Sequence, residues 1–419
     1  MTLSCGLDFG TSNSTLGRIA ADGAPHLLPL EGEQLTLPSV LFFGAEDRTI
    51  HFGRAALSEY ISGADGRLLR SIKSVLGTKL FDDGVRLGAR VYRFDDIVGI
   101  FVAELKARGE AATGLELDAV VVGRPVQFVD DDPVADAEAQ RQLEQAVRRQ
   151  GFAHVEFQFE PIAAALDYER QVDRERIALI VDLGGGTSDF SLVRVAPERA
   201  GRADRSDDIL ATAGVHIGGT DFDRLLAMSR VMPELGLGSR TIDGKRHLPV
   251  APYVDLSTWH RINRLYDAKA QRDLRSTIRE AREAEKVETF VMLVEDRLGH
   301  RLIGAVEDAK IALSDGDAVR FDFAVRDRRI ETLMTGAQLA EALAASIGRL
   351  EQTIAQTLRL AGLSAKEIDS LILTGGSTLV PAVYGRLRAL LPEAQVVRTD
   401  VLGSVGLGLA LEAKRIFGA

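Results

Sequence analysis

The stretch DLGGGTSDFSL at residues 182–192 repeats a pattern that the chain has already used in DFGTSNSTL at residues 8–16. Each copy contains Asp-x-Gly, then Thr-Ser-Asn or Thr-Ser-Asp, and then Ser or Thr before Leu. A short apolar run precedes each copy, LSCGL at 3–7 and IALIV at 177–181. Short β-rich runs bounded by Gly, Ser, Asn and Asp are typical of a strand, a tight turn and a second strand. The repeat therefore predicts two similar hairpins.

The turn of each hairpin carries the chemistry of a phosphate site. Glycine lets the backbone turn several N–H groups to one side, and a concave row of N–H groups binds anions. An aspartate beside an anion indicates a metal cation between the two. The copies lie 174 residues apart, which is about one domain length. The sequence thus predicts an internal duplication, with two lobes that close on one phosphate chain.

The composition limits the classes of protein to which the chain can belong. The chain has 419 residues, of which 46% are hydrophobic and 27% charged, an ordinary globular balance with room for two cores. The formal net charge of −10 argues against nucleic-acid binding. The single cysteine, Cys5, lies in an apolar strand, which favours a buried thiol and a reducing compartment. No apolar run reaches membrane-spanning length and no signal peptide is evident, so we expect a cytoplasmic protein without membrane contact.

Strand clusters alternate with helical patterns twice along the chain, which predicts an α/β architecture. A buried strand is expected at 117–126 and a hairpin around Asp327. Helices are expected at 95–110, 136–152, 160–170, 267–288 and 336–363. The helix at 267–288 is laced with charge, which favours a solvated face.

Two further glycine turns accompany the hairpins. Gly218-Gly219 in GVHIGGTDFDRLL opens a helix, where backbone N–H groups suit phosphate, and LTGGSTL at 373–379 supplies the fourth turn. The sequence contains neither a P-loop nor a dinucleotide-binding Gly-x-Gly-x-x-Gly between strand and helix.

Five segments together resemble the Hsp70 chaperones of the actin/sugar-kinase/Hsp70 ATPase superfamily. They are GLDFGTSNS, FEPIAAAL, VDLGGGTSDFSLV, GGTDFD and LILTGGST, in the family's order and at near-matching spacings. The resemblance implies an actin-like ATPase fold of two ribonuclease-H-like lobes around a nucleotide cleft. It implies that the chain binds ATP and ADP, hydrolyses ATP slowly with Mg²⁺, and changes its lobe angle with nucleotide state.

The resemblance also implies the cation sites. Asp8 and Asp182 match the carboxylates around the water shell of Mg²⁺, with K⁺ as a further cation. Asp189 matches another cation-site aspartate. Because Mg²⁺ keeps several of its waters, carboxylates in the second shell are expected.

Catalytic roles follow from the same comparison. Lys73, in IKSVLG, matches the family's catalytic lysine, which orients the attacking water and offsets charge on the γ-phosphoryl group. Glu160 matches the glutamate that places water and metal, and Thr187 completes the catalytic set with Asp8 and Asp182. Pro125 matches the proline of the turn that relays nucleotide state between the lobes.

The nucleotide contacts implied by the resemblance lie in the four turns and one helix. The hairpin turns are expected to grip the β- and γ-phosphates through Gly10, Thr11, Ser12, Asn13, Gly184, Gly185, Gly186 and Thr187. The remaining contacts are expected at Gly218, Gly219, Glu307, Lys310, Ile311, Ser314, Gly375, Gly376, Ser377 and Leu379.

The sequence departs from the family pattern in three places. Ile311 and Leu379 stand where the family clamps adenine between two arginines, so cation–π stacking of about 0.5–2 kcal/mol per arginine is lost. The sequence ends at KRIFGA, without the family's linker, peptide-binding domain and lid. The segment between Asp221 and Glu307 is expanded. This combination resembles the short bacterial YegD-type branch of the family.

These observations predict a division of the chain. Lobe I is expected at 1–175 with an inserted subdomain at about 38–105, and lobe II at 176–419 with an expanded helical subdomain at about 221–311. The C-terminal helix is expected to pack back toward lobe I. The resemblance implies adenine nucleotide as ligand, and co-chaperones or unfolded clients as partners of a molecular chaperone.

Several alternatives stay open. A small-molecule kinase of the same fold would need an acceptor pocket and an acidic base, and an actin-like filament subunit or a nucleotide sensor without hydrolysis is also compatible with the fold. In the expanded segment, the spacing of His247, His260 and His300 fits no metal-ligand motif. Trp259 is expected to be a local packing anchor.

Overall fold

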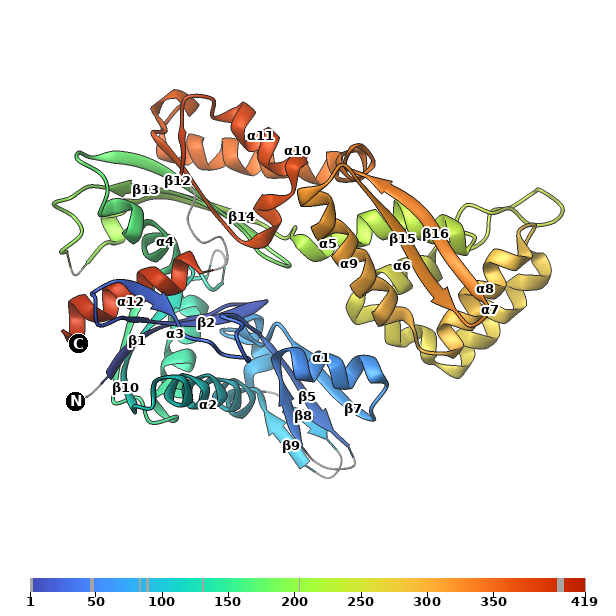
Figure 1. The fold of residues 1–419 in the computed structure, drawn as a ribbon, viewed down its shortest axis with the longest axis horizontal. Helices are drawn as coiled ribbons and strands as arrows, with labels where there is room; N and C mark the ends of the chain where they lie inside the picture. The colour runs from blue at the N-terminus through green and yellow to red at the C-terminus, as the bar shows by residue number, and fades with distance from the viewer. Residues whose placement is uncertain are drawn as a thin grey trace.

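The computed structural model describes residues 3–45, 49–82, 84–87, 90–129, 132–202, 204–397 and 403–418. Two sheets of the same topology form the frame of the molecule (Figure 1). The first has the order β11-β10-β1-β2-β3 with β4 on β2, and the second has the order β14-β13-β12-β17-β18. In both, the first three strands of the chain are antiparallel and the last two are parallel. The repeated order confirms the predicted duplication and α/β fold.

Lobe I carries the first sheet. Its strands are β1 (Leu3–Phe9), β2 (Asn13–Ile19), β3 (Pro25–Leu27), β4 (Leu37–Pro38), β10 (Leu117–Arg124) and β11 (His154–Phe159). Its helices are α2 (Phe94–Thr113), α3 (Pro133–Arg148) and α4 (Glu160–Glu169). The chain between β4 and α2 forms β5 (Val40–Gly44), β6 (Ile50–Phe52), α1 (Gly53–Ser62), β7 (Gly66–Arg70), η1 (Ile72–Val75), η2 (Lys79–Asp82), β8 (Gly84–Leu87) and β9 (Arg90–Arg93).

Lobe II carries the second sheet. Its strands are β12 (Arg176–Leu183), β13 (Ser188–Val195), β14 (Ile209–Val215), β17 (Ser370–Thr374) and β18 (Gln395–Val397), and β15 (Ala318–Val325) pairs separately with β16 (Arg328–Thr335). Among its α-helices are α5 (Gly219–Leu226), α6 (Ala251–Ser257), α7 (Ala268–Glu280), α8 (Ala284–Glu295), α9 (Gly299–Asp315), α10 (Gly336–Ala361) and α11 (Pro381–Leu390). Short helical turns are η3 (Ser206–Asp208), η4 (Ala227–Val231), η5 (Met232–Leu235), η6 (Trp259–Tyr266), η7 (Ala365–Glu367) and η8 (Gly376–Leu379).

The charged helix expected over 267–288 is two helices, so that prediction was wrong in one respect. The break falls at Ala281, which is buried, takes an extended conformation and forms a bridge with Thr241. The N–H of Arg282 donates to the carbonyl of Arg240 at 2.9 Å. A loop distant in sequence therefore supplies the hydrogen bonds that would otherwise continue the helix.

Helices α4 and α12 (Ser404–Phe417) lie between the two sheets (Figure 1). Helix α12 packs on β1, β2, β10 and α4. One buried cluster joins both lobes here, with Val121 from lobe I, Ile162 from α4, Ile180 and Ile372 from lobe II, and Leu409 from α12. The lobes therefore share an apolar core at their base.

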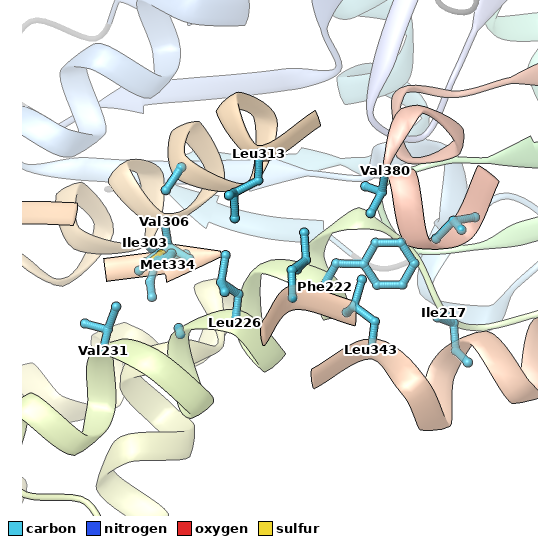
Figure 2. Close-up of a cluster of buried hydrophobic side chains, with 14 of the residues drawn as sticks. Ile217, Phe222, Leu226, Val231, Ile303, Val306, Leu313, Met334, Leu343 and Val380 are labelled. Carbon is cyan, nitrogen blue, oxygen red and sulfur yellow. The ribbon is translucent and has the colours of Figure 1, made fainter. Parts of the chain in front are cut away.

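A larger core holds the elements of lobe II that surround the cleft. Figure 2 shows Phe222 of α5 beside Leu343 of α10 and Val380, which follows η8, and it shows Val306 of α9 in the same cluster. All four side chains are buried. Phe222, Val306 and Val380 each lie within a few residues of a predicted nucleotide contact. One apolar core, to which Leu343 of α10 also belongs, therefore positions those contacts.

None of the helices in the described part of the chain combines the length and apolar character needed to span a lipid bilayer.

Candidate functional site

The turns of the two repeated hairpins meet across the cleft. A Cβ atom built on Gly185, between β12 and β13, would lie only 2.4 Å from the hydroxyl oxygen of Ser12, between β1 and β2. The N–H of Gly184 donates to the carbonyl of Thr187 at 3.0 Å and closes the second turn. The absence of a side chain at Gly185 thus lets the lobes approach where the sequence predicted a phosphate site.

The third turn packs directly on the second. The N–H of Gly219 donates to the carbonyl of Gly184 at 3.0 Å, and the N–H of Thr220 donates to the carbonyl of Gly185 at 2.9 Å. A Cβ atom on Gly218 would lie 2.5 Å from backbone atoms of Gly185. The N-terminus of α5 is therefore fixed beside the hairpin turn by close backbone contact that excludes any side chain.

The fourth turn reaches the same place from β17. Gly375 has φ +81°, and a Cβ atom there would lie 2.2 Å from the carbonyl oxygen of Leu183 and 3.0 Å from a carboxylate oxygen of Asp182. The hydroxyl of Ser377 donates to the carbonyl of Gly184 at 3.4 Å. The structure thus gathers all four predicted turns, including Gly10, Thr11, Asn13, Gly186 and Gly376, around one cleft.

Acidic side chains line the floor of this cleft. Asp182 and Asp189 are opposite each other in the β12–β13 pair, and Asp8 occupies the matching position in β1. Loss of surrounding water, with repulsion from Glu160, raises the pKa of Asp8 to about 7, although Lys73 opposes the shift. Loss of water, with repulsion from Asp189, Glu160 and Asp8, raises the pKa of Asp182 to about 8. Among the residues that the structure describes, the positive charge of Lys73 does not offset burial and repulsion at either carboxylate.

That deficit fits a hydrated magnesium ion. A divalent cation would stabilise the ionised forms of Asp8 and Asp182, which the surrounding protein disfavours. Within the described part of the chain, no three His, Cys, Asp or Glu side chains converge closely enough to bind a metal ion directly. Carboxylates that hold the ion through its water shell need no such convergence.

Lys73 and Glu160 form an ion pair at the floor. The ammonium nitrogen of Lys73 lies 2.5 Å from Oε1 of Glu160, and the two side chains are 8% and 18% exposed. Burial lowers the pKa of Lys73, but Glu160, Asp8 and Asp182 outweigh that effect and raise it. Lys73 is therefore a cation held among carboxylates. Glu160 opens α4, where a carboxylate is favoured by the helix dipole.

The residues expected on the nucleoside side share one face of α9. Glu307, Lys310, Ile311 and Ser314 follow the spacing of a single helical face. The ammonium of Lys310 lies 2.7 Å from a carboxylate oxygen of Asp223 in α5, and both are buried. Burial raises the pKa of Asp223 to about 7, against the lowering effect of Lys310.

Two aliphatic side chains replace the arginines expected of the family. Ile311 on α9 is 55% exposed and Leu379 at the end of η8 is 54% exposed. Their neighbours Lys310 and Ser377 both approach Gly219, where a Cβ atom would lie 3.6 Å and 2.7 Å from their polar atoms. The two elements therefore meet at the third turn.

The lobes also touch at the mouth of the cleft. The amide of Asn263 in η6 donates to the hydroxyl of Tyr60 in α1 at 2.6 Å, and this hydroxyl lies 3.2 Å from Nε2 of His300. The guanidinium of Arg70 stacks on the ring of Trp259 at 4.7 Å. We call these five residues the mouth contact. Trp259 also packs edge-on against His300, so it anchors local structure and a contact between lobes.

A cavity of about 510 Å³ adjoins the floor near Pro125. Glu160, Asp182 and Asp189 line it together with polar residues such as Thr212 and Gln356. Thr374, next to the fourth turn, also lines it, whereas the glycines of the four turns do not. The cavity therefore reaches the acidic floor from another side than the turns.

Asp223, Tyr60 and Arg70 were not foreseen as parts of the site. Each has its partner far away in sequence, and no local pattern marks such pairs.

Comparison with known proteins gives a consistent result. A family model described as "Hsp70 protein" matches residues 84–232 and 275–416, which is more than half of the chain. The chaperone protein HscA of Salmonella newport (strain SL254) is 26% identical over 437 residues, covering 99% of this chain and 58% of the relative. HscA of Salmonella heidelberg (strain SL476) matches to the same extent. The chain thus spans a little under three fifths of the length of these relatives.

Proposed function

The chain belongs to the Hsp70 family, and from this premise we propose that it binds ATP with Mg²⁺ between its lobes and hydrolyses it to ADP and phosphate. The approach of Ser12 to Gly185, in a cleft that also holds the buried Lys73–Glu160 pair, carries the proposal. Two glycine turns, an ammonium and an acidic floor close to one another are the features that support it.

Each part has a role in this proposal. N–H groups of the turns that contain Gly10 and Gly184–Thr187 bind the β- and γ-phosphates. Asp8 and Asp182 would hold Mg²⁺ through its water shell, where the ion would neutralise phosphate charge, and Asp189 would contribute to a K⁺ site.

Hydrolysis follows from positioning and electrostatics. Glu160 and Lys73 orient a water whose oxygen bonds to the γ-phosphorus as the bond to the β–γ bridging oxygen breaks. Lys73 offsets the charge that develops on the γ-phosphoryl oxygens. The products are ADP, inorganic phosphate and a proton, and no covalent intermediate is needed.

The nucleoside is assigned to the α9 face and to η8. Glu307, Lys310 and Ser314 bind its polar edge, and Ile311 and Leu379 cover the base with aliphatic surface. We further propose the division into lobe I at 1–175 and lobe II at 176–419, which the two matching sheets support. Nucleotide state then changes the angle between the lobes.

Single-turnover hydrolysis of ATP with Mg²⁺ and K⁺ tests the proposal. Measurable hydrolysis, lost in Asp182→Ala, would support it. A chain that binds no adenine nucleotide at millimolar concentration would refute it.

A chaperone role is the broader proposal, prompted by the names of the relatives. Its test is the suppression of aggregation of an unfolding protein by the purified chain, with and without ATP. The absence of any nucleotide-dependent effect would confine the role to ATP hydrolysis.

The cavity beside the acidic floor favours a second candidate, a small-molecule kinase. Asp182 or Asp189 would accept the proton of an acceptor hydroxyl bound there. ATP turnover that is unchanged by a panel of sugars and polyols would count against this candidate.

A further inference from the structure

Helix α4 connects the reaction centre to lobe II. It begins at Glu160, which pairs with Lys73, and it ends at Glu169. Its ten residues span about 15 Å. From Pro161 to Glu169 every side chain but Asp167 is buried. A short, buried helix moves as a rigid rod, so a shift at one end reaches the other.

At the end of α4, both carboxylate oxygens of Glu169 accept hydrogen bonds from lobe II. Two guanidinium nitrogens of Arg205, in the β13–β14 connection, donate to the two oxygens of Glu169 at 2.8 and 2.9 Å. The N–H of Ala196 donates to one of these oxygens at 2.9 Å. The side chains of Arg205 and Glu169 are only 3% and 1% exposed.

Two further charges complete this cluster. Arg205 also donates to Asp208, and Arg199 donates to the other oxygen of Asp208. Asp208 is 1% exposed. The cluster therefore has two positive and two negative groups in a nearly dry environment, where removal of one partner leaves a costly unpaired charge.

Two further contacts hold α4 in place, one with β17 and one with α12. The hydroxyls of Tyr168 in α4 and Ser370 in β17 lie 2.6 Å apart and are buried. Helix α12 lies so close that a Cβ atom on Gly408 would be 1.8 Å from the carbonyl oxygen of Ala163. Thus α4 is held lengthwise by lobe II and sideways by α12.

We propose that Arg205 is a positioning residue for hydrolysis, because its grip on Glu169 sets the place of α4 and thereby of Glu160 against Lys73. This inference rests on the proposed function. Rotation of lobe II carries Arg205, and the rod transmits the movement to the reaction centre. A displacement of about 1 Å at Glu160 is enough to lower the rate of a positioned reaction by about a hundredfold.

The informative variant is the double substitution Glu169→Gln with Arg205→Met. It removes one charge of each sign, keeps an acceptor for the N–H of Ala196, and leaves Arg199 paired with Asp208. The matched control is Ile330→Ala at a buried position of the β15–β16 hairpin, where truncation leaves a cavity and lowers the unfolding temperature without touching α4. Both variants are compared with the unsubstituted chain below their unfolding temperatures.

We expect single-turnover hydrolysis to fall at least about tenfold in the double variant, with the ADP dissociation constant within about threefold of the parent value. The control should keep the parent rate. Equal rates in the double variant and the parent, or equal loss in the control, would overturn the proposal.

A second readout does not need hydrolysis. In a crystal structure of the double variant, the distance from Nζ of Lys73 to Oε1 of Glu160 should exceed hydrogen-bonding range, about 3.5 Å. An unchanged pair would overturn the positioning role even if the parent chain proved unable to hydrolyse ATP. Failure of the proposed function would instead appear as absent hydrolysis in the parent with a displaced pair in the variant.

Discussion

The ammonium of Lys73 and the carboxylate of Glu160 lie 2.5 Å apart at the floor of the cleft, one on a short helical turn of lobe I and the other at the start of α4. The two residues lie far apart in the sequence. Under the proposed function, this pair holds a cation beside the charge that develops on the γ-phosphoryl group.

Replacement of Lys73 should separate catalysis from binding. We expect Lys73→Ala to lower single-turnover hydrolysis about 10²–10³-fold, while ATP affinity changes little, because the ammonium acts mainly on transition-state charge. Lys106→Ala is the matched control, since Lys106 pairs with Glu110 at 2.7 Å on α2, away from the cleft. Equal rates for Lys73→Ala and Lys106→Ala would contradict the role of Lys73.

The acidic floor predicts pH-dependent magnesium binding. The folded, metal-free chain holds protons on Asp8 and Asp182 up to pKa values of about 7 and about 8, whereas the unfolded chain releases them near pH 4. The unfolded state therefore binds fewer protons, and the stability of the metal-free protein should fall as pH rises from about 4 to about 8.

Because Mg²⁺ competes with these protons, its affinity should rise over the upper part of the same range, with proton release. Calorimetric titration with Mg²⁺ and ADP at pH 6, 7 and 8, in buffers of different ionisation enthalpy, measures both effects. Asp182→Asn should reduce the proton release. A pH-independent affinity would show that these carboxylates do not face the ion.

The mouth contact should slow nucleotide release. Tyr60→Phe removes the hydroxyl that accepts from Asn263, a loss of about 1 kcal/mol, and should speed ADP release about fivefold. Tyr92→Phe is the control, because that ring packs on Phe43 within lobe I. Stopped-flow release of a fluorescent ADP analogue gives both rates, and equal rates would exclude a gating role.

The aliphatic base site predicts a gain of function. Ile311→Arg should tighten ADP binding about two- to thirtyfold, since a stacked guanidinium contributes about 0.5–2 kcal/mol. Leu333→Arg, at an exposed position of β16, adds the same charge away from the cleft. If both variants change the ADP dissociation constant equally, the effect is one of net charge and Ile311 does not face the base.

The hairpins and their pairing could be predicted from sequence because the pattern is local. Asp8 and Asp182 precede tight turns between apolar runs, and the repeat itself indicates two equivalent lobes. The shared face of Glu307, Lys310 and Ser314 also follows from helical spacing alone.

Contacts between distant segments could not be predicted in this way. The break at Ala281 depends on a loop near Thr241, and Lys310 finds Asp223 only once α5 and α9 have packed. The same holds for Glu169 and Arg205, which are separated by two strands of the sheet. Such pairs depend on tertiary geometry, and neither partner carries a local signal.

The packing of α12 on β1, β2 and α4 has a consequence for how the chain is made. A ribosome releases β1 well before α12, and the second sheet is made between them. Until Gly406 and Gly408 reach their places against Thr15 and Ala163, the inner face of the first sheet stays uncovered. We therefore expect nascent chains in which α12 has not yet been made to be aggregation-prone and protease-sensitive in lobe I.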